Sequence, residues 1–308
     1  MVNTEKLYFM GVDIGGTKIW ICITDFNGNI IYKKKTSTAK NINAIHSTVV
    51  NCLLEARISF EELNFISFGI PGTTNSESGV VLDAPALGWI DVQFKMEMEL
   101  RLPVPILINN DVNCAALGEQ WAGATKKIQN FVFIAIGTGV GGAIVTNGAL
   151  VQGEHFMAGE IGNFLLGKDA IKQTDNARVD GQFGWFENKT SGTALAKHGV
   201  DPKQLFLEYK EGDPKALIIV DEFIDYLSMG IANIVSLLNP KKVILGGGVT
   251  QSLGDIISII ESNIAKYLPT PVSIEVSELG ELSGAIGAIA FGIEEQKDPF
   301  EPISEESY

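Results

Sequence analysis

The sequence predicts an α/β protein, and three features support that class. Short apolar runs alternate with segments of helical apolar spacing along the 308 residues. That length favours two domains or one large one. The same opening, an apolar strand followed by a glycine-rich turn and another strand, occurs at Asp13–Lys18 and again at Gly137–Gly142. This repetition hints at an internal duplication.

The first half begins as an antiparallel meander and continues as strand and helix. The expected strands are Leu7–Val12, Ile19–Thr24, Ile30–Lys34, Phe65–Ile70 and Val104–Asn109. Helical spacing is found at 42–57 and 112–121. The second of these helices follows directly on a strand, at the kind of junction where α/β proteins place ligands.

The second half restarts the pattern. The expected strands are Phe131–Ile136, Ala143–Thr146 and Val243–Leu245, and the expected helices are Ala216–Leu238 and Leu282–Ile293. Between them, the polar stretch Lys168–Gly184 is expected to be a surface loop. The acidic tail from Glu294 is expected to fray.

The composition is that of a soluble globular protein. Apolar residues make up 45% and the formal net charge is −14, which argues against a nucleic-acid surface. Three scattered cysteines fit a reducing compartment. Neither a signal peptide nor an apolar run long enough to span a membrane is apparent. We therefore expect a cytoplasmic protein without membrane or nucleic-acid partners.

The two glycine-rich turns are candidate phosphate-binding loops. Glycine lets the backbone approach a ligand closely, and consecutive N–H groups form an anion site. In the first turn, Asp13 is expected near Mg²⁺, and Thr17 or Lys18 near phosphate oxygens. The alternative is a tight hairpin that needs glycine only for its shape, and the spacing of a Walker A loop is absent.

Several further positions have both a functional and a structural interpretation. Asp111 at a strand-to-helix junction could accept the proton of a hydroxyl that attacks a phosphoryl group, but on position alone an N-cap aspartate is the more common case. Gly246–Gly248 could let a flat base lie on the backbone, or simply form a turn. Glu160 and Glu187 could bind sugar hydroxyls, or be solvated surface residues. The three histidines lack metal-ligand spacing.

Taken together, the motifs resemble those of the ROK family of sugar kinases and sugar-responsive repressors, within the actin-like ATPase superfamily. The resemblance extends from about Tyr8 to Ile293. The motifs that carry it, in order, are Gly11–Lys18, Gly69–Gly72, Leu87–Trp89, Asn110–Asn113 with Ala115–Glu119, Gly137–Gly142, Ala158–Gly162 and Leu245–Val249.

The resemblance implies two ribonuclease-H-like domains with a cleft between them. We expect a small domain at 1–110, completed by a C-terminal helix at about 285–308, and a large domain at 111–284. ATP would lie mostly on the second domain, with the sugar at the hinge. The family also suggests a homodimer.

The resemblance also assigns roles to residues. Asp111 matches the catalytic base. The implied sugar-side residues are Gly72, Asn110, Glu160, Asn163 and Glu187. The implied nucleotide-side residues are Asp13, Gly15, Gly16, Thr17 and Lys18 in the first loop, Gly137, Thr138 and Gly139 in the second, and Gly247 at the adenosine; Asp13 would hold Mg²⁺ through water.

The chain departs from the family pattern at its structural zinc site. Where members carry one histidine and three cysteines, this sequence has Asn163, Arg178, Asp180 and Trp185. These side chains cannot replace a thiolate-rich tetrahedral site, so we expect no zinc. The missing histidine also contacts sugar in zinc-bearing members, and Ala86 stands where many carry asparagine. Both changes affect the expected sugar side.

The sequence therefore predicts an ATP-dependent hexose kinase that uses Mg²⁺ and acts at the 6-hydroxyl. A repressor is disfavoured, because no winged-helix module fits before the first loop. The alternative is a non-catalytic sugar or nucleotide sensor of the same fold.

Overall fold

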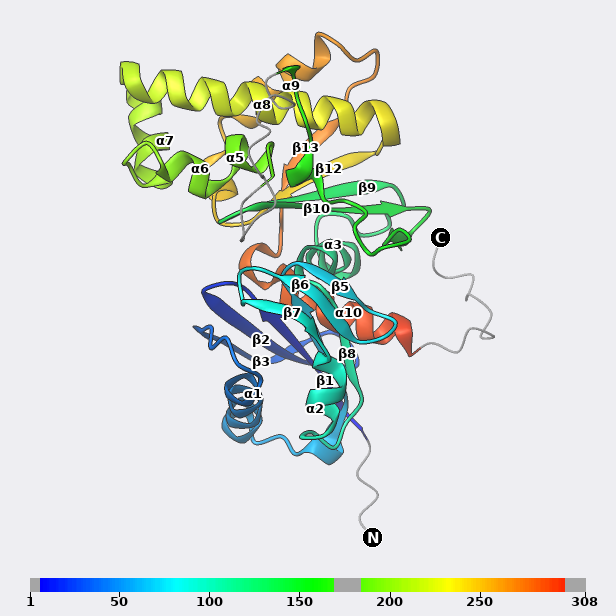
Figure 1. Cartoon of the computed structure of the whole chain (residues 1–308). Coiled ribbons are helices and arrows are strands. Elements are labelled where there is room, and N and C mark those ends of the chain that lie inside the picture. Colours follow the sequence, from blue (N-terminus) through cyan, green and yellow to red (C-terminus); the bar gives the residue numbers. More distant parts are fainter. Residues whose placement is uncertain (1–5, 169–183, 297–308) are drawn as a thin grey trace. The chain divides into compact units, whose positions relative to one another are not determined.

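The computed structural model describes residues 6–168 and 184–296 (Figure 1). Their backbone divides into two compact units. Unit 1 contains the described residues of 1–127, 153–157 and 281–308, and unit 2 those of 128–152 and 158–280. The first unit thus extends beyond the boundary expected at residue 110, because the helix that starts at Asp111 packs on the C-terminal helix of the same unit.

Unit 1 is built on a five-stranded sheet of order β3-β2-β1-β4-β8. Its strands are β1 (Tyr8–Ile14), β2 (Lys18–Asp25), β3 (Ile30–Ser37), β4 (Leu63–Ile70) and β8 (Ile106–Asn110). The first three pair antiparallel, as the meander predicted, and β4 and β8 run parallel to β1. β1 and β4 are almost wholly buried, which is the continuous apolar pattern of strands covered on both faces.

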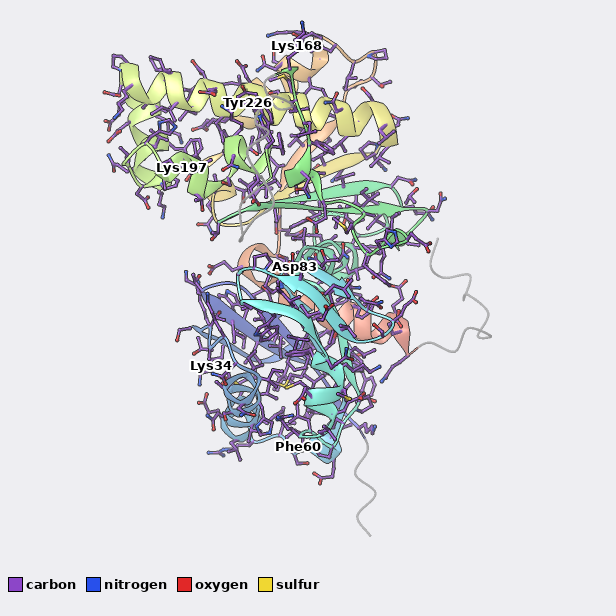
Figure 2. All side chains as sticks on the ribbon, in the orientation of Figure 1. Lys34, Phe60, Asp83, Lys168, Lys197 and Tyr226 are labelled. Carbon is purple, nitrogen blue, oxygen red and sulfur yellow. The ribbon has the colours of Figure 1, made fainter. Side chains whose placement is uncertain are left out.

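Four helices accompany this sheet: α1 (Ile42–Ala56), α2 (Phe94–Glu99), α3 (Asp111–Ala122) and α10 (Ser283–Glu295). α10 packs against α3 and against β1 and β4. Small residues allow the close approach, because a Cβ on Gly287 would overlap the carbonyl of Cys114 in α3. The sheet also carries charge on its exposed strand, where Lys34, labelled in Figure 2, forms a 2.6 Å ion pair with Glu55.

A second, three-stranded antiparallel sheet in unit 1 was not predicted. It consists of β5 (Thr73–Asn75), β6 (Val80–Ala84) and β7 (Trp89–Val92). These strands are three to five residues long, too short to give a clear alternation in the sequence.

Unit 2 repeats the design of unit 1. Its sheet has the order β11-β10-β9-β12-β13. The strands are β9 (Phe131–Ile136), β10 (Val140–Thr146), β11 (Ala149–Val151), β12 (Lys242–Gly246) and β13 (Ser273–Val276). Again three antiparallel strands are followed by two parallel ones. The likeness of the two glycine-rich openings therefore extends to the topology of both sheets.

The helices of unit 2 are α5 (Glu187–Thr190), α6 (Gly192–Ala196), α7 (Pro202–Glu211), α8 (Pro214–Leu238) and α9 (Ile257–Ala265), with short turns η2 (Ile161–Asn163) and η3 (Thr250–Ser252). α8 begins at a capping aspartate, Asp213, whose side chain accepts from Lys215 N and Ala216 N at 2.9 Å each. It ends at Asn239 in the left-handed conformation. Among the described residues, no helix is long and apolar enough to span a membrane.

Candidate active site

The first glycine-rich turn is a hairpin between β1 and β2. Gly15 N donates to Lys18 O at 2.8 Å and closes the turn. Thr38 holds it from the other side: its N–H donates to Thr17 O at 3.0 Å and its hydroxyl to Gly15 O at 2.7 Å. The N–H groups of Gly16 and Thr17 donate to no other described residue. Two backbone donors are thus available for an anion.

Asp13 lies inside β1 rather than in the turn, and it is close to Asp111. Burial, and to a smaller extent the charge of Asp111, raise the pKa of Asp13 well above its ordinary value. Burial also raises the pKa of Asp111 to about 6, against a hydrogen bond from Val112 N that lowers it. Gly284, at the start of α10, leaves space for the carboxyl of Asp13: a Cβ there would lie 2.5 Å from its Cγ. Three elements of unit 1 therefore converge on two acidic side chains.

Asn110, rather than Asp111, is the N-cap of α3. Its Oδ1 accepts from Val112 N at 2.8 Å and from Asn113 N at 3.0 Å. Its Nδ2 donates to Gly72 O at 2.8 Å. The N-cap interpretation thus belongs to Asn110, which leaves Asp111 as the first residue of the helix, where its negative charge is favoured by the helix dipole.

Gly72 lies between β4 and β5, in a backbone conformation that requires glycine. Its φ is +88°, and a Cβ would overlap the carbonyl of Asp83 in β6. Only glycine fits such a position without strain. The carbonyl of Gly72 therefore reaches the side chain of Asn110, so these two predicted sugar-side residues lie together in unit 1.

The second glycine-rich turn is a hairpin between β9 and β10 in unit 2. Gly137 N donates to Gly139 O at 2.9 Å. The start of α6 holds the hairpin, because Gly192 N donates to Gly137 O at 2.8 Å and Thr193 N to Thr138 O at 3.4 Å. The N–H groups of Thr138 and Gly139 donate to no other described residue. This is the same arrangement as in the first hairpin, with carbonyls held and two N–H groups available.

Glu187 lies against this hairpin. Its Oε2 accepts from Val140 N at 2.6 Å. A Cβ on Gly139 would overlap the same oxygen, and a Cβ on Gly162 would lie 3.4 Å from the Cβ of Glu187. Burial raises the pKa of Glu187, and the hydrogen bond from Val140 N opposes that shift. The interpretation as a solvated surface glutamate is therefore wrong.

Glu160 and Asn163 lie at the two ends of η2, beside β10. Glu160 is half-buried and Asn163 is exposed. Asn163 N donates to Glu160 O at 3.2 Å. A Cβ on Gly184 would come 2.8 Å from the Oδ1 of Asn163, so the segment that leads to Glu187 runs next to it. The three predicted sugar-side residues of unit 2 thus share one neighbourhood.

A cavity of about 530 Å³ opens beside the second hairpin. It is lined by Gly137 and Thr138, by α6 and the start of α7, and by residues 248, 249, 251 and 252. Its volume lies in the range of small-molecule and cofactor sites. Gly248 lines it, whereas Gly247, the predicted adenosine contact, has φ +92° and faces the backbone of Ile136.

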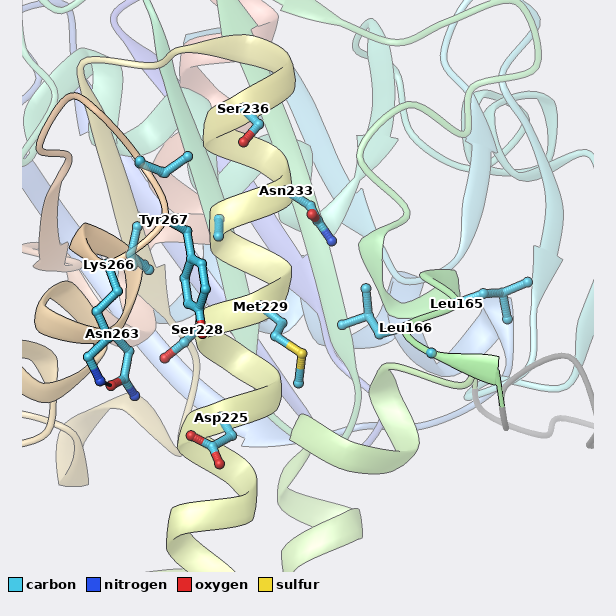
Figure 3. Close-up of a pocket in the computed structure, with 14 residues that line it drawn as sticks. Leu165, Leu166, Asp225, Ser228, Met229, Asn233, Ser236, Asn263, Lys266 and Tyr267 are labelled. Atoms are coloured by element: carbon cyan, nitrogen blue, oxygen red, sulfur yellow. Dashed lines mark hydrogen bonds between the residues drawn. The ribbon is translucent and has the colours of Figure 1, made fainter.

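A larger cavity of about 800 Å³ lies elsewhere in unit 2, between α8, the end of α9 and Leu165–Gly167 (Figure 3). Ser228 lines it, and its buried hydroxyl has no hydrogen-bond partner among the described residues. None of the residues that the sequence singled out for chemistry lines this cavity. Of the two cavities, the smaller one is thus the one that adjoins residues singled out by the sequence, Gly137 and Thr138.

The expected absence of zinc concerns four positions. Arg178 and Asp180 lie outside the described residues, whereas Asn163 and Trp185 lie within them. In the part of the chain that the structure describes, no group of three or more His, Cys, Asp or Glu side chains is placed to hold a metal ion. The absence of zinc remains a prediction.

The sequence did not reveal the residues that donate hydrogen bonds to the carbonyl groups of the two hairpins. These are Thr38 in unit 1, and Gly192 and Thr193 in unit 2. Their contacts bring residues together over more than 20 positions of sequence, and no local motif marks them.

Comparisons with known proteins identify the family of the chain. The family model described as "ROK family" matches residues 9–295. A glucokinase of Halalkalibacterium halodurans is 33% identical, covering 91% of this chain and 93% of the relative. An N-acetyl-D-glucosamine kinase of Pectobacterium atrosepticum is 29% identical, covering 91% and 97%.

A solved structure supports the same assignment. It is a ROK family glucokinase from Streptomyces griseus in complex with glucose and AMPPNP. It superposes with a TM-score of 0.77 at 25% identity and covers 92% of this chain and 98% of its own. The fold and the matched length confirm the resemblance, and the chain belongs to the ROK family.

Proposed function

We propose that this protein transfers the γ-phosphoryl group of ATP to the 6-hydroxyl of a hexose or hexose derivative. The observation that carries the proposal is the half-buried pair Asp13 and Asp111 next to a hairpin with available N–H donors. The glucokinase and N-acetylglucosamine kinase relatives, matched over nine-tenths of the chain, support the same class of reaction.

The donor side is supported by features of both units. The available N–H groups of each hairpin suit phosphate oxygens, and the cavity beside the second hairpin suits a nucleoside. Asp13 would hold Mg²⁺ through water: its carboxylate suits that cation, and a bound cation would offset the burial and repulsion that raise its pKa. Mg²⁺, when bound, would neutralise charge on the phosphates.

The chemical step follows from the position of Asp111. Its pKa of about 6 leaves the carboxylate ionised at neutral pH, yet basic enough to accept a proton. The sugar hydroxyl would give its proton to Asp111 while its oxygen forms a bond to the γ-phosphorus. The bond from that phosphorus to the bridging oxygen breaks, and ADP leaves.

The sugar side would be formed by Gly72, Asn110, Glu160, Asn163 and Glu187. Asn110 uses both ends of its amide within unit 1, so it would present its remaining Nδ2 hydrogen to a hydroxyl. Asn163 stands where family members carry a histidine, and it offers a neutral amide instead of an imidazole. Its side chain is exposed, and we expect sugar preference to be set at this position.

The direct test is ADP release over a panel of sugars. The panel holds glucose, mannose, fructose, allose, glucosamine, N-acetylglucosamine and N-acetylmannosamine, each with ATP and Mg²⁺. We expect turnover with at least one, and a 6-phosphate product by NMR. Binding of sugar and nucleotide without turnover on the panel would contradict the kinase and favour a sensor of the same fold. We also expect a homodimer, which light scattering after size exclusion would measure.

A further inference from the structure

The second hairpin is held by one carboxylate as well as by backbone contacts. Val140 N is the donor that follows the two available N–H groups of Thr138 and Gly139. It donates to Glu187 Oε2 at 2.6 Å, a short distance for an N–H to carboxylate bond. Glu187 therefore fixes the backbone of the hairpin at the point where the candidate phosphate donors end.

The packing around Glu187 restricts the position of its side chain. The side chain occupies the space that a Cβ on Gly139 would need, and it lies beside Gly162. Its neighbour Lys189 pairs instead with Glu222 at 3.0 Å. Burial and the Val140 hydrogen bond are the two influences on its pKa. The Val140 N–H thus compensates a partly buried charge, as such charges require.

We infer that Glu187 is a positioning residue for the nucleotide: by accepting the Val140 N–H, it holds the second hairpin in the shape that offers the Thr138 and Gly139 N–H groups to phosphate. This inference rests on the proposed function. It differs from the sugar-hydroxyl role that the family implies, because it places the effect of Glu187 on nucleotide binding with no sugar present.

The two roles predict different results. If Glu187 binds only sugar, removing its side chain leaves the affinity for nucleotide alone unchanged. If it positions the hairpin, the affinity for nucleotide alone falls, and a replacement that keeps an acceptor oxygen restores most of it. Hydrogen bonds to a charged group are among the stronger ones in proteins, so we expect a loss of about tenfold for alanine.

The experiment measures binding of AMPPNP with Mg²⁺ by calorimetry, on the full chain and without sugar. The variants are Glu187→Ala and Glu187→Gln. The matched controls are Glu222→Ala and Glu222→Gln, which change an exposed carboxylate of the same unit that does not touch the hairpin. We expect Glu187→Ala to bind about tenfold more weakly, Glu187→Gln to stay within about threefold of the wild type, and both controls to match it.

Hydrogen exchange of the nucleotide-free protein provides a second readout. The amides of residues 137–141 should exchange faster in Glu187→Ala than in Glu222→Ala. If the alanine variant does not fold, Glu187→Met, which has a side chain of similar length without an acceptor oxygen, takes its place in this comparison. Glu187→Ala binding within twofold of the wild type, or unchanged exchange at 137–141, would overturn the inference while leaving the kinase intact. A wild-type protein that binds no AMPPNP would refute the proposed function and this inference together.

Discussion

Replacing Asp111 by asparagine should nearly abolish turnover and at the same time make the protein more stable. Asparagine has the same shape and keeps an oxygen that can accept from Val112 N, but it cannot take up a proton. Removing a positioned base typically costs about 10²–10⁴ in rate. The same change removes a half-buried negative charge that lies close to Asp13 and Cys114.

The gain in stability follows from the pKa. Folding raises the pKa of Asp111 from an ordinary 3.8 to about 6, and that shift corresponds to about 3 kcal/mol. Because the pKa is higher in the folded state, the protonated form is favoured there, and stability is lost as the pH rises through 6. Asp111 keeps part of its surface exposed, so about 3 kcal/mol is an upper value and about 1–3 is expected.

The assay is urea unfolding of the wild type and Asp111→Asn between pH 4 and pH 8, without nucleotide or Mg²⁺, together with ADP release. We expect the difference in the free energy of unfolding between Asp111→Asn and the wild type to grow by up to about 2 kcal/mol from pH 4 to pH 8. This difference should be constant above pH 7. In the wild type, kcat/KM should rise through about pH 6 as Asp111 ionises. A variant that is less stable at pH 8, or one that keeps near-normal turnover, would refute the reasoning.

Three further predictions concern other parts of the molecule. Gly284→Ala should raise the KM for MgATP or lower kcat about tenfold while changing stability by less than about 1 kcal/mol, because the atoms nearest to the added Cβ are those of the Asp13 carboxyl, at the end of its side chain. A large loss of stability with normal kinetics would contradict this. Gly139→Ala should displace the Glu187 carboxylate from Val140 N. AMPPNP should therefore bind the double variant Gly139→Ala/Glu187→Ala no more weakly than Gly139→Ala alone. Additive losses of affinity in this double-mutant cycle would contradict the prediction. Treatment with EDTA should leave the melting temperature of the nucleotide-free protein unchanged, and stoichiometric zinc by atomic absorption in untreated protein would show that a zinc site exists after all.

Most of the strands and the long helices could be predicted from sequence alone. The buried strands read as unbroken apolar runs because they are covered on both faces. α8 is 25 residues long, with a capping aspartate before it and helical apolar spacing along it. The three short strands of the second sheet in unit 1 escaped prediction, because segments of three to five residues carry too few positions to show a period.

The sequence by itself determined the two glycine hairpins, the strand-to-helix junction at Asp111 and the class of fold, because each depends on residues that are adjacent in the chain. The tertiary structure decided which side chain caps α3, where Asn110 takes the role that Asp111 could have had. It also decided that Glu187 is partly buried against the second hairpin. Both outcomes depend on burial and on donors brought from distant segments, and desolvation by such neighbours has no local sequence signature.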